Sequence, residues 1–369
     1  MPLEEEIRRE RAEIRSDGYP MSIGELINLY RDDELDIHPE FQRFYRWSEA
    51  QKSRLIESLL LGIPIPSIFV SQREDGVWDV VDGLQRLATI FELVGILKDD
   101  QHNVLAPLTL TKTHYLPSLE GKRWEDEDHP ENALGPSNQL LIKRAKIDVK
   151  IILRESSEAA KYELFQRLNT GGSQLSEQEV RNVLLIMVNP EFYRWVRQLA
   201  TDESFQSCIG LSENAGLQQY DVDLAVRFLV LRAQDEGKLK GIGDMGEYLN
   251  DQAIQLAQKT NFDRDHEGVA FRFTFASLAE TLGEDSFRRY DTTKQRYVGK
   301  FLLSVFEVLA LGLGYNFERC QHDKVMPDII SVSQNLWENE EFRRYSGSGV
   351  RASSRIPHTV PLGRTLMSP

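Results

Sequence analysis

The sequence predicts an α+β protein, in which a mixed α/β front half is followed by an α-helical back half. Before about residue 155, strand-like and helix-like runs alternate, whereas after it nearly every apolar run has the 3.6-residue spacing of a helix. The length of 369 residues suits two domains of about 100–200 residues each. We expect a first domain at 1–170, a helical domain at 171–341 and an Arg-rich closing segment at 342–369.

Capping and turn residues place the elements of the front half. Ser22 and Glu25 form a capping box that predicts a helix at 22–30, and Ser48 with Gln51 begins a second helix that stops at Gly62. The other expected elements are an extended segment at 35–47, a hairpin of 67–72 with 77–82, a helix at 84–97, strands at 105–111 and 145–153, and a polar loop at 118–139.

The back half reads as a series of amphipathic helices. They are expected at 157–168, 176–188, 190–201, 221–236, 244–259, 267–282, 294–312 and 326–345. No internal repeat and no low-complexity tract interrupts this series.

Composition excludes several classes of protein. The longest apolar run, 302–314, is too short for a membrane span and contains Glu307, and the charged N-terminus has no signal-peptide core. The two cysteines, Cys208 and Cys320, lie far apart and support neither a disulfide framework nor a zinc site. We therefore expect a reduced, cytoplasmic protein with no membrane partner.

Charge is unevenly distributed along the chain. The net charge of −14 argues against a general nucleic-acid coat, but 342–369 has no acid and five arginines. This segment is either a solvated tail or a segment that contacts phosphates. The candidate phosphate contacts are Arg351, Arg355 and Arg364.

The stretch DVVDGLQRLATI (79–90) places polar groups where a strand gives way to a helix. A helix N-terminus presents free N–H groups, and Gly83 would let an anion approach them. Arg86 can fork onto a phosphate, and Gln85 can orient a water. Asp82 can hold Mg²⁺ or activate a water, and Thr89 adds a hydroxyl one turn along.

A purely structural explanation of the same turn stays open. Asp82 is a good N-cap residue and Gly83 a common turn residue. Arg86 would then pair with Glu92 or with a neighbouring strand.

Two further segments add polar side chains that would suit a ligand. Gln42 and Arg43 follow Pro39 in an extended, aromatic-rich stretch, which is either a covered edge strand or a second arm of a nucleotide pocket. Asn169, Thr170 and Gly171 lie in the turn of FQRLNTGGSQLSEQEVRN (165–182), which a plain link between two helices also explains.

Together, these segments resemble the N-terminal domain family of the GmrSD-type modification-dependent restriction endonucleases. The chain carries HPEFQRFYRW, LLLGIPIP, DGLQR and LNTGGSQLSEQE in the family's order, over roughly residues 20–185. The ending YSGSGVRASSRIPHTVPLGR is similar to that of stand-alone members.

The resemblance implies a first domain similar to the ParB and sulfiredoxin fold, with nucleotide binding and hydrolysis linked to the DGxQR region. It points to Asp82, Gly83, Gln85 and Arg86, with Gln42 and Arg43 and, more weakly, Asn169, Thr170 and Gly171. Leu84 and Ala88 stand where many members have Gln and Thr, so the turn offers fewer polar ligands than in those members.

The sequence leaves three functions open. The first is a nucleotide-binding, NTP-hydrolysing component of a DNA-targeting defence system, with Mg²⁺ on Asp82, Arg43 closing over the phosphates, and a separate nuclease subunit, because no His-Asn-His constellation is legible. The second is a metal-dependent DNA nuclease that uses the same turn. The third is a non-catalytic module that binds DNA or a partner protein.

Overall fold

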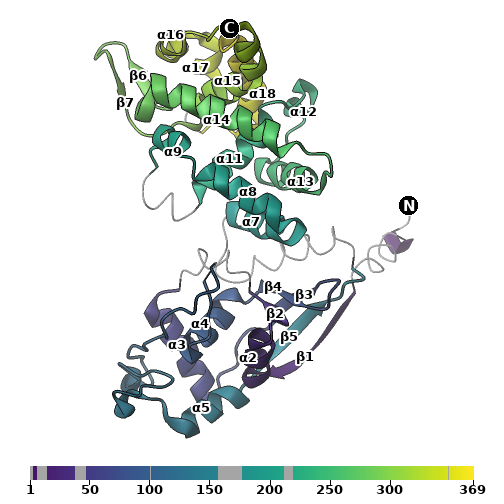
Figure 1. Cartoon of the computed structure of the whole chain (residues 1–369), viewed down its shortest axis with the longest axis vertical. Helices are drawn as coiled ribbons and strands as arrows, with labels where there is room; N and C mark the ends of the chain where they lie inside the picture. Colours follow the sequence, from purple (N-terminus) through teal and green to yellow (C-terminus); the bar gives the residue numbers. More distant parts are fainter. Residues whose placement is uncertain are drawn as a thin grey trace. The chain divides into compact units, whose positions relative to one another are not determined.

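A computed structural model describes residues 3–5, 15–37, 47–99, 101–156, 177–211, 219–347 and 349–369. The chain splits into two compact units, Met1–Gln174 and Leu175–Pro369 (Figure 1). The first unit contains a mixed sheet with helices, and the second is largely helical. The predicted α+β class is therefore confirmed. The finer likeness to the ParB and sulfiredoxin fold stays a prediction.

The first unit is built on a five-stranded sheet with the order β1-β5-β3-β4-β2. The strands are β1 (Ser16–Ser22), β2 (Leu35–Asp36), β3 (Ile68–Gln72), β4 (Trp78–Asp82) and β5 (Lys146–Ile152). β1 pairs antiparallel with β5, and β3 pairs antiparallel with β4. The β5–β3 and β2–β4 pairs are parallel, so the sheet is mixed.

Four helices share one core with this sheet. They are α2 (Ile23–Arg31), α3 (Glu49–Leu61), α4 (Leu84–Val94) and α5 (Gly135–Arg144), which lie beside the sheet in Figure 1. The predicted N-caps are confirmed, because Ser22 accepts from the Glu25 amide and Ser48 forms a full capping box with Gln51.

The front half differs from the sequence prediction in three places. β1 was not predicted, because Gly18 and Pro20 are poor strand residues, which an edge strand tolerates. The strand predicted at 105–111 is wrong. Leu108 and Leu110 are buried alternately, but Leu110 bonds to Lys122, outside the sheet. α5 begins inside the segment predicted as a loop.

The second unit consists of helices around an aromatic core that includes Phe228, Phe271 and Phe275. The helices are α7 (Glu177–Val188), α8 (Pro190–Ala200), α9 (Glu203–Ile209), α11 (Tyr220–Leu231), α12 (Glu236–Lys240), α13 (Met245–Gln258), α14 (Arg264–Thr281), α15 (Leu303–Asp323), α16 (Ile329–Asn335), α17 (Glu340–Tyr345) and α18 (Ala352–Leu366). None of the helices within the described ranges has the length and apolar character needed to cross a bilayer.

Four predicted helices, at 176–188, 190–201, 244–259 and 267–282, are confirmed within a few residues. The helix predicted at 294–312 is wrong at its start, where β6 (Arg289–Asp291) and β7 (Arg296–Val298) form a hairpin. The helices predicted at 221–236 and 326–345 are each interrupted, and α9 was missed. The helix predicted at 157–168 lies outside the described residues.

The Arg-rich segment contributes a packed helix to the second unit. α18 crosses α15 so closely that a Cβ on Gly312 would lie 2.3 Å from the Gly363 carbonyl oxygen. Ile356, Thr359 and Val360 are buried on α18. The alternative of a solvated tail is therefore wrong for this helix.

Candidate functional site

A β-bulge sets the position of Asp82 at the end of β4. Phe69 pairs with Asp82 and Val70 pairs with Val80, so Val81 is an extra residue between these pairs. The bulge lets Val80 and Val81 both be buried, while the Asp82 side chain is 43% exposed. Bulges of this kind re-aim side chains and are frequent beside active sites.

Gly83 converts the strand into a helix in a single residue. Its φ of 99° lies in the left-handed region, and it is the N-cap of α4 with no side-chain capping bond. A Cβ at this position would lie 2.4 Å from Cγ2 of Ile68 on β3. Only glycine therefore fits here. Because glycine has no side chain, no capping side chain covers the backbone N–H groups in the first turn of α4.

Arg86 is held across this turn. Its Nη2 donates to Oδ2 of Asp82 at 3.0 Å, and its Nη1 donates to the carbonyl oxygen of Pro66 at 3.2 Å. The Arg86 side chain is only 11% exposed. The guanidinium is thus fixed between the end of β4 and the chain that leads into β3.

The structural explanation offered two partners for Arg86, Glu92 or a neighbouring strand. The pairing with Glu92 is wrong, whereas Asp82, which Arg86 does contact, is the last residue of β4. Glu92 instead accepts from Lys52 Nζ of α3 at 2.6 Å. This pair ties α3 to α4 and leaves Arg86 to its two contacts at the turn.

Gln85 and Thr89, the other predicted residues of this turn, have different surroundings. Gln85 Oε1 accepts from the Trp47 amide at 3.3 Å, so the turn is tied to the start of the segment that carries α3. Thr89 is fully buried and donates its hydroxyl to the Gln85 carbonyl at 2.7 Å. Asp82, Gly83, Gln85 and Arg86 therefore come together, whereas Thr89 lies inside the helix packing. Their roles toward a ligand stay predictions.

Five candidate residues lie outside the described part of the chain. They are Gln42, Arg43, Asn169, Thr170 and Gly171. Their proximity to the turn stays a prediction. Trp47, which follows the 38–46 segment directly, is bonded to Gln85.

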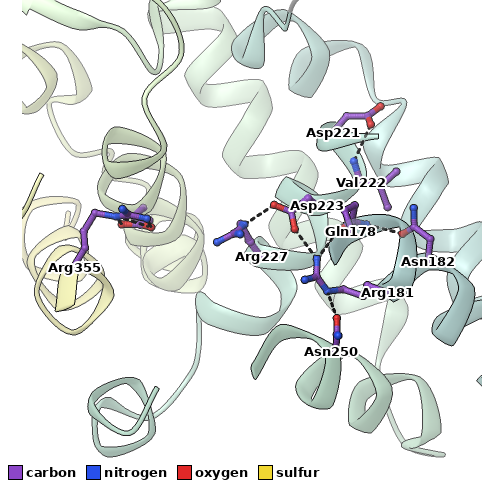
Figure 2. Close-up of polar contacts among 10 residues, drawn as sticks. Gln178, Arg181, Asn182, Asp221, Val222, Asp223, Arg227, Asn250 and Arg355 are labelled. Atoms are coloured by element: carbon purple, nitrogen blue, oxygen red, sulfur yellow. Dashed lines mark hydrogen bonds and ion pairs between the residues drawn. The ribbon is translucent and has the colours of Figure 1, made fainter. Parts of the chain in front are cut away.

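A buried charged cluster, which the sequence did not predict, lies in the second unit. Arg181 of α7 and Arg227 of α11 approach the Asp223 carboxylate from two sides, each at 2.6 Å (Figure 2). Arg181 also donates to Asn250 of α13 at 3.0 Å and to Gln178. A sequence signal was available, because Asp223 and Arg227 interrupt the otherwise apolar run of α11 four residues apart.

Burial and opposite charge act against each other in this cluster. Burial by itself would raise the pKa of Asp223, but Arg227 and Arg181 outweigh it and hold the pKa of that carboxyl below its usual value. Burial, and then the charge of Asp223, raises the pKa of the nearby Tyr220 to about 12. Asp223 is therefore ionised and Tyr220 protonated at neutral pH.

The three tail arginines have different surroundings. Arg355 forks onto Glu307, with Nε and Nη2 each 2.9 Å from a carboxylate oxygen, and Glu307 is only 1% exposed. Arg364 donates to three carbonyl oxygens at the end of α11 and just after it, those of Leu231, Arg232 and Gln234. Arg351 is exposed at the N-cap of α18. Phosphate contact by these residues stays a prediction, and Arg355 and Arg364 would have to leave bonds inside the second unit.

The described residues offer few side chains that could bind a metal ion. No group of three or more His, Cys, Asp or Glu side chains in those ranges is arranged to hold a metal. Asp82 supplies one half-exposed carboxylate, which fits Mg²⁺ that arrives with a nucleotide and keeps phosphate and water ligands. Burial raises the pKa of the Cys208 thiol to about 11, which keeps it protonated at neutral pH.

Comparison with known proteins identifies the front of the chain. Residues 23–186 match the family model described as GmrSD restriction endonuclease, N-terminal domain. No curated protein matches the chain. No solved structure matches it either. The matched range runs from the start of α2 into α7 and includes the whole turn between β4 and α4. The match indicates a component of a restriction or defence system. Residues 23–186 of this chain belong to the GmrSD restriction endonuclease N-terminal domain family.

Proposed function

We propose that this chain is the nucleotide-binding, NTP-hydrolysing component of a DNA-targeting restriction system, and that the turn 82–86 binds the phosphates. The observation that carries the proposal is the position of Arg86. Its guanidinium is fixed at the glycine-capped N-terminus of α4, next to a half-exposed carboxylate. A fixed cation beside a helix N-terminus suits a phosphate, because both offer positive charge and N–H donors.

Arg86 has bonding capacity beyond its two contacts. A guanidinium carries five N–H donors, and the contacts described for Arg86 use one each toward Asp82 and Pro66. A phosphate would compete with the Asp82 carboxylate for Nη2. Mg²⁺ on Asp82 would compensate for the loss of that ion pair, and when bound it would neutralise phosphate charge. Gln85 would orient the attacking water, with its backbone carbonyl held by Thr89.

The contacts of Arg86 also favour a second function, a non-catalytic module that binds DNA or a partner protein. Arg86 joins the end of β4 to the Pro66 carbonyl, as a purely structural arginine would. Leu84 in place of a polar residue removes one possible ligand from the turn. The two functions differ in whether nucleotide binds.

Calorimetry with ATP, GTP, CTP and UTP in the presence of Mg²⁺ tests the proposal. We expect Arg86→Ala to weaken binding of the preferred nucleotide about 10- to 100-fold. A hydrogen bond to a charged group contributes about 1.5–3 kcal/mol, and the variant loses this contribution. Arg86→Lys should restore part of this loss, because it keeps the charge without the fork. Release of inorganic phosphate then measures turnover, which Asp82→Asn should lower.

Arg73→Ala is the matched control. Arg73 is also an ion-paired arginine at this sheet, 2.8 Å from Asp36 and 2.9 Å from Asp79, but it follows β3 rather than the turn. Its loss should leave nucleotide affinity unchanged. If wild type bound no nucleotide, or if Arg86→Ala bound as tightly as Arg73→Ala, the phosphate site would be refuted and the non-catalytic function favoured.

A further inference from the structure

A basic hairpin stands out from the side of the helical unit, between α14 and α15 (Figure 1). β6 and β7 pair antiparallel, with Tyr290 opposite Tyr297 and Asp291 opposite Arg296. The turn is closed by Asp291, whose Oδ1 accepts from the amides of Thr293 and Lys294, both at 3.0 Å. The hairpin is therefore a defined two-stranded ribbon with its own turn bonds.

Aromatic contacts anchor this ribbon to the rest of the unit. Tyr290 and Tyr297 pack edge to face, with ring centroids 5.1 Å apart. The Tyr297 hydroxyl is hydrogen-bonded to the Ser333 hydroxyl of α16. The Arg289 guanidinium lies 5.0 Å from the ring centroid of Trp337. The two tyrosines are thus half-buried and already in contact with each other or with α16. These contacts, together with the stacking of Arg289 on Trp337, hold the base of the ribbon.

The ribbon concentrates positive charge on an acidic protein. Residues 286–300 contain five cations and one acid, whereas the whole chain carries −14. Arg288 pairs with Glu284 and Asp285, and Lys294 lies 3.5 Å from Asp291. Arg296 and Lys300 are exposed and, among the described residues, have no carboxylate within ion-pair distance. Arg289 is exposed too, and stacks on Trp337 without an acidic partner in the same residues.

We propose that the β6–β7 hairpin contacts the phosphate backbone of duplex DNA through Arg289, Arg296 and Lys300. The choice of DNA rests on the proposed function. These cations, which have no carboxylate partner in the described ranges, favour binding of a polyanion to the hairpin, because the negative net charge of the rest of the protein repels it. A two-stranded ribbon fits a duplex groove. Single strands are bound chiefly by stacking on exposed rings, and here the two tyrosines are engaged in the fold.

Fluorescence anisotropy with a labelled duplex, measured across a salt series, tests this surface on the full chain. We expect Arg296→Gln/Lys300→Gln to weaken binding by on the order of tenfold or more near 0.1 M salt. The slope of log K against log salt should fall by about 1.8, since each lost phosphate contact removes about 0.9 from the slope.

The control removes the same two charges elsewhere on the same unit. Arg319→Gln/Lys259→Gln changes one arginine and one lysine, exposed on α15 and after α13. It should leave the salt slope unchanged. Equal effects of the two double variants would refute the hairpin as a DNA contact, because the change in net charge alone would then explain the weaker binding. Tighter binding of a single strand than of the duplex would also overturn the proposal.

A nucleotide titration separates this inference from the proposed function. The hairpin double variant should bind nucleotide like wild type, and Arg86→Ala should bind duplex like wild type when no nucleotide is present. Absence of nucleotide binding by wild type, with duplex binding intact, would refute the phosphate site. Absence of duplex binding by wild type, with nucleotide binding intact, would refute the hairpin contact.

Discussion

At the residue scale, Gly83 determines whether the turn between β4 and α4 can form. Its left-handed φ and its contact with Ile68 are two separate constraints, and both exclude a side chain. Gly76, in the β3–β4 turn, shares the first constraint with a φ of 90°, but a Cβ there would meet nothing within 4 Å. A comparison of alanine substitutions at the two glycines therefore separates the cost of backbone strain from the cost of steric overlap.

We expect Gly83→Ala to lower the free energy of unfolding by about 2–4 kcal/mol, and Gly76→Ala by only about 1 kcal/mol. The difference reports the overlap with Ile68, since both variants place alanine at a similar positive φ. Urea denaturation of both variants measures it. Equal losses would show that β3 yields to the added methyl group, and that the close packing at the turn contributes little.

The polar residues of the turn are legible in the sequence, but not all of their partners are. The caps Ser22 and Ser48 were predictable, because each bonds to an amide three residues on. The Pro66 carbonyl, 20 residues before Arg86, depends on how β3 and β4 pair, and no local pattern encodes it.

At the element scale, Asp223 joins helices that are far apart in the sequence. Its carboxylate binds Arg181 of α7 and Arg227 of α11, and Arg181 extends the link to Asn250 of α13. A buried carboxylate between two arginines stabilises the fold only while it is ionised. Removing one partner of such a buried pair leaves uncompensated charge, which costs about 3–5 kcal/mol.

We expect Asp223→Asn to destabilise the protein by about 3–5 kcal/mol at neutral pH. The pKa of Asp223 is lowered in the folded state, so its contribution is fully present above the unfolded pKa of about 3.9 and is lost as pH falls through the folded pKa. The stability gap between wild type and variant should therefore be constant from about pH 7 to 5 and shrink below about pH 4. Thermal unfolding across pH measures this gap.

Asp221→Asn is the control for this prediction. Asp221 lies on the same helix and accepts from the Val222 amide at 2.9 Å, at the edge of the buried cluster (Figure 2). Its replacement should change stability by less than about 1 kcal/mol. A gap for Asp223→Asn that persists unchanged to pH 2 would show that the carboxylate charge does not matter.

Elements with clean periodicity were predictable, and those decided by partners were not. The segment 294–312 contains a long apolar helix pattern, but its first residues pair with β6 through Tyr290 and Tyr297. The strand predicted at 105–111 alternates correctly, yet its described backbone bonds lead to Lys122 and Gly121 rather than to the sheet. In both cases tertiary pairing overrode the local pattern.

At the scale of the whole molecule, the chain divides into two compact units at residues 174 and 175. The first has a core shared by its sheet and four helices, and the second an aromatic core centred on Phe271 and Phe275. The predicted domain border near residue 170 rests on the change in periodicity along the chain. The strand order β1-β5-β3-β4-β2 was not predicted, because it depends on pairings across more than 100 residues.

We expect fragments 1–174 and 175–369 to fold separately, because each contains its own apolar core. Each should give a cooperative thermal transition in calorimetry and a dispersed amide spectrum. A fragment that stayed unfolded alone but folded on mixing with the other would show that the units depend on each other for stability.

The place of β5 in the sheet has a consequence for synthesis of the protein. β5 lies between β1 and β3, so neither half of the sheet is joined to the other until residues 146–152 have been made. The β3–β4 hairpin and α4 involve only near neighbours, and they can form on the nascent chain well before that point. Strand β1 must then wait, with an open edge, for a partner about 130 residues downstream. A ribosome that pauses before β5 would therefore expose a bare strand edge, and this interval is when we expect the chain to be most prone to aggregation and to need a chaperone.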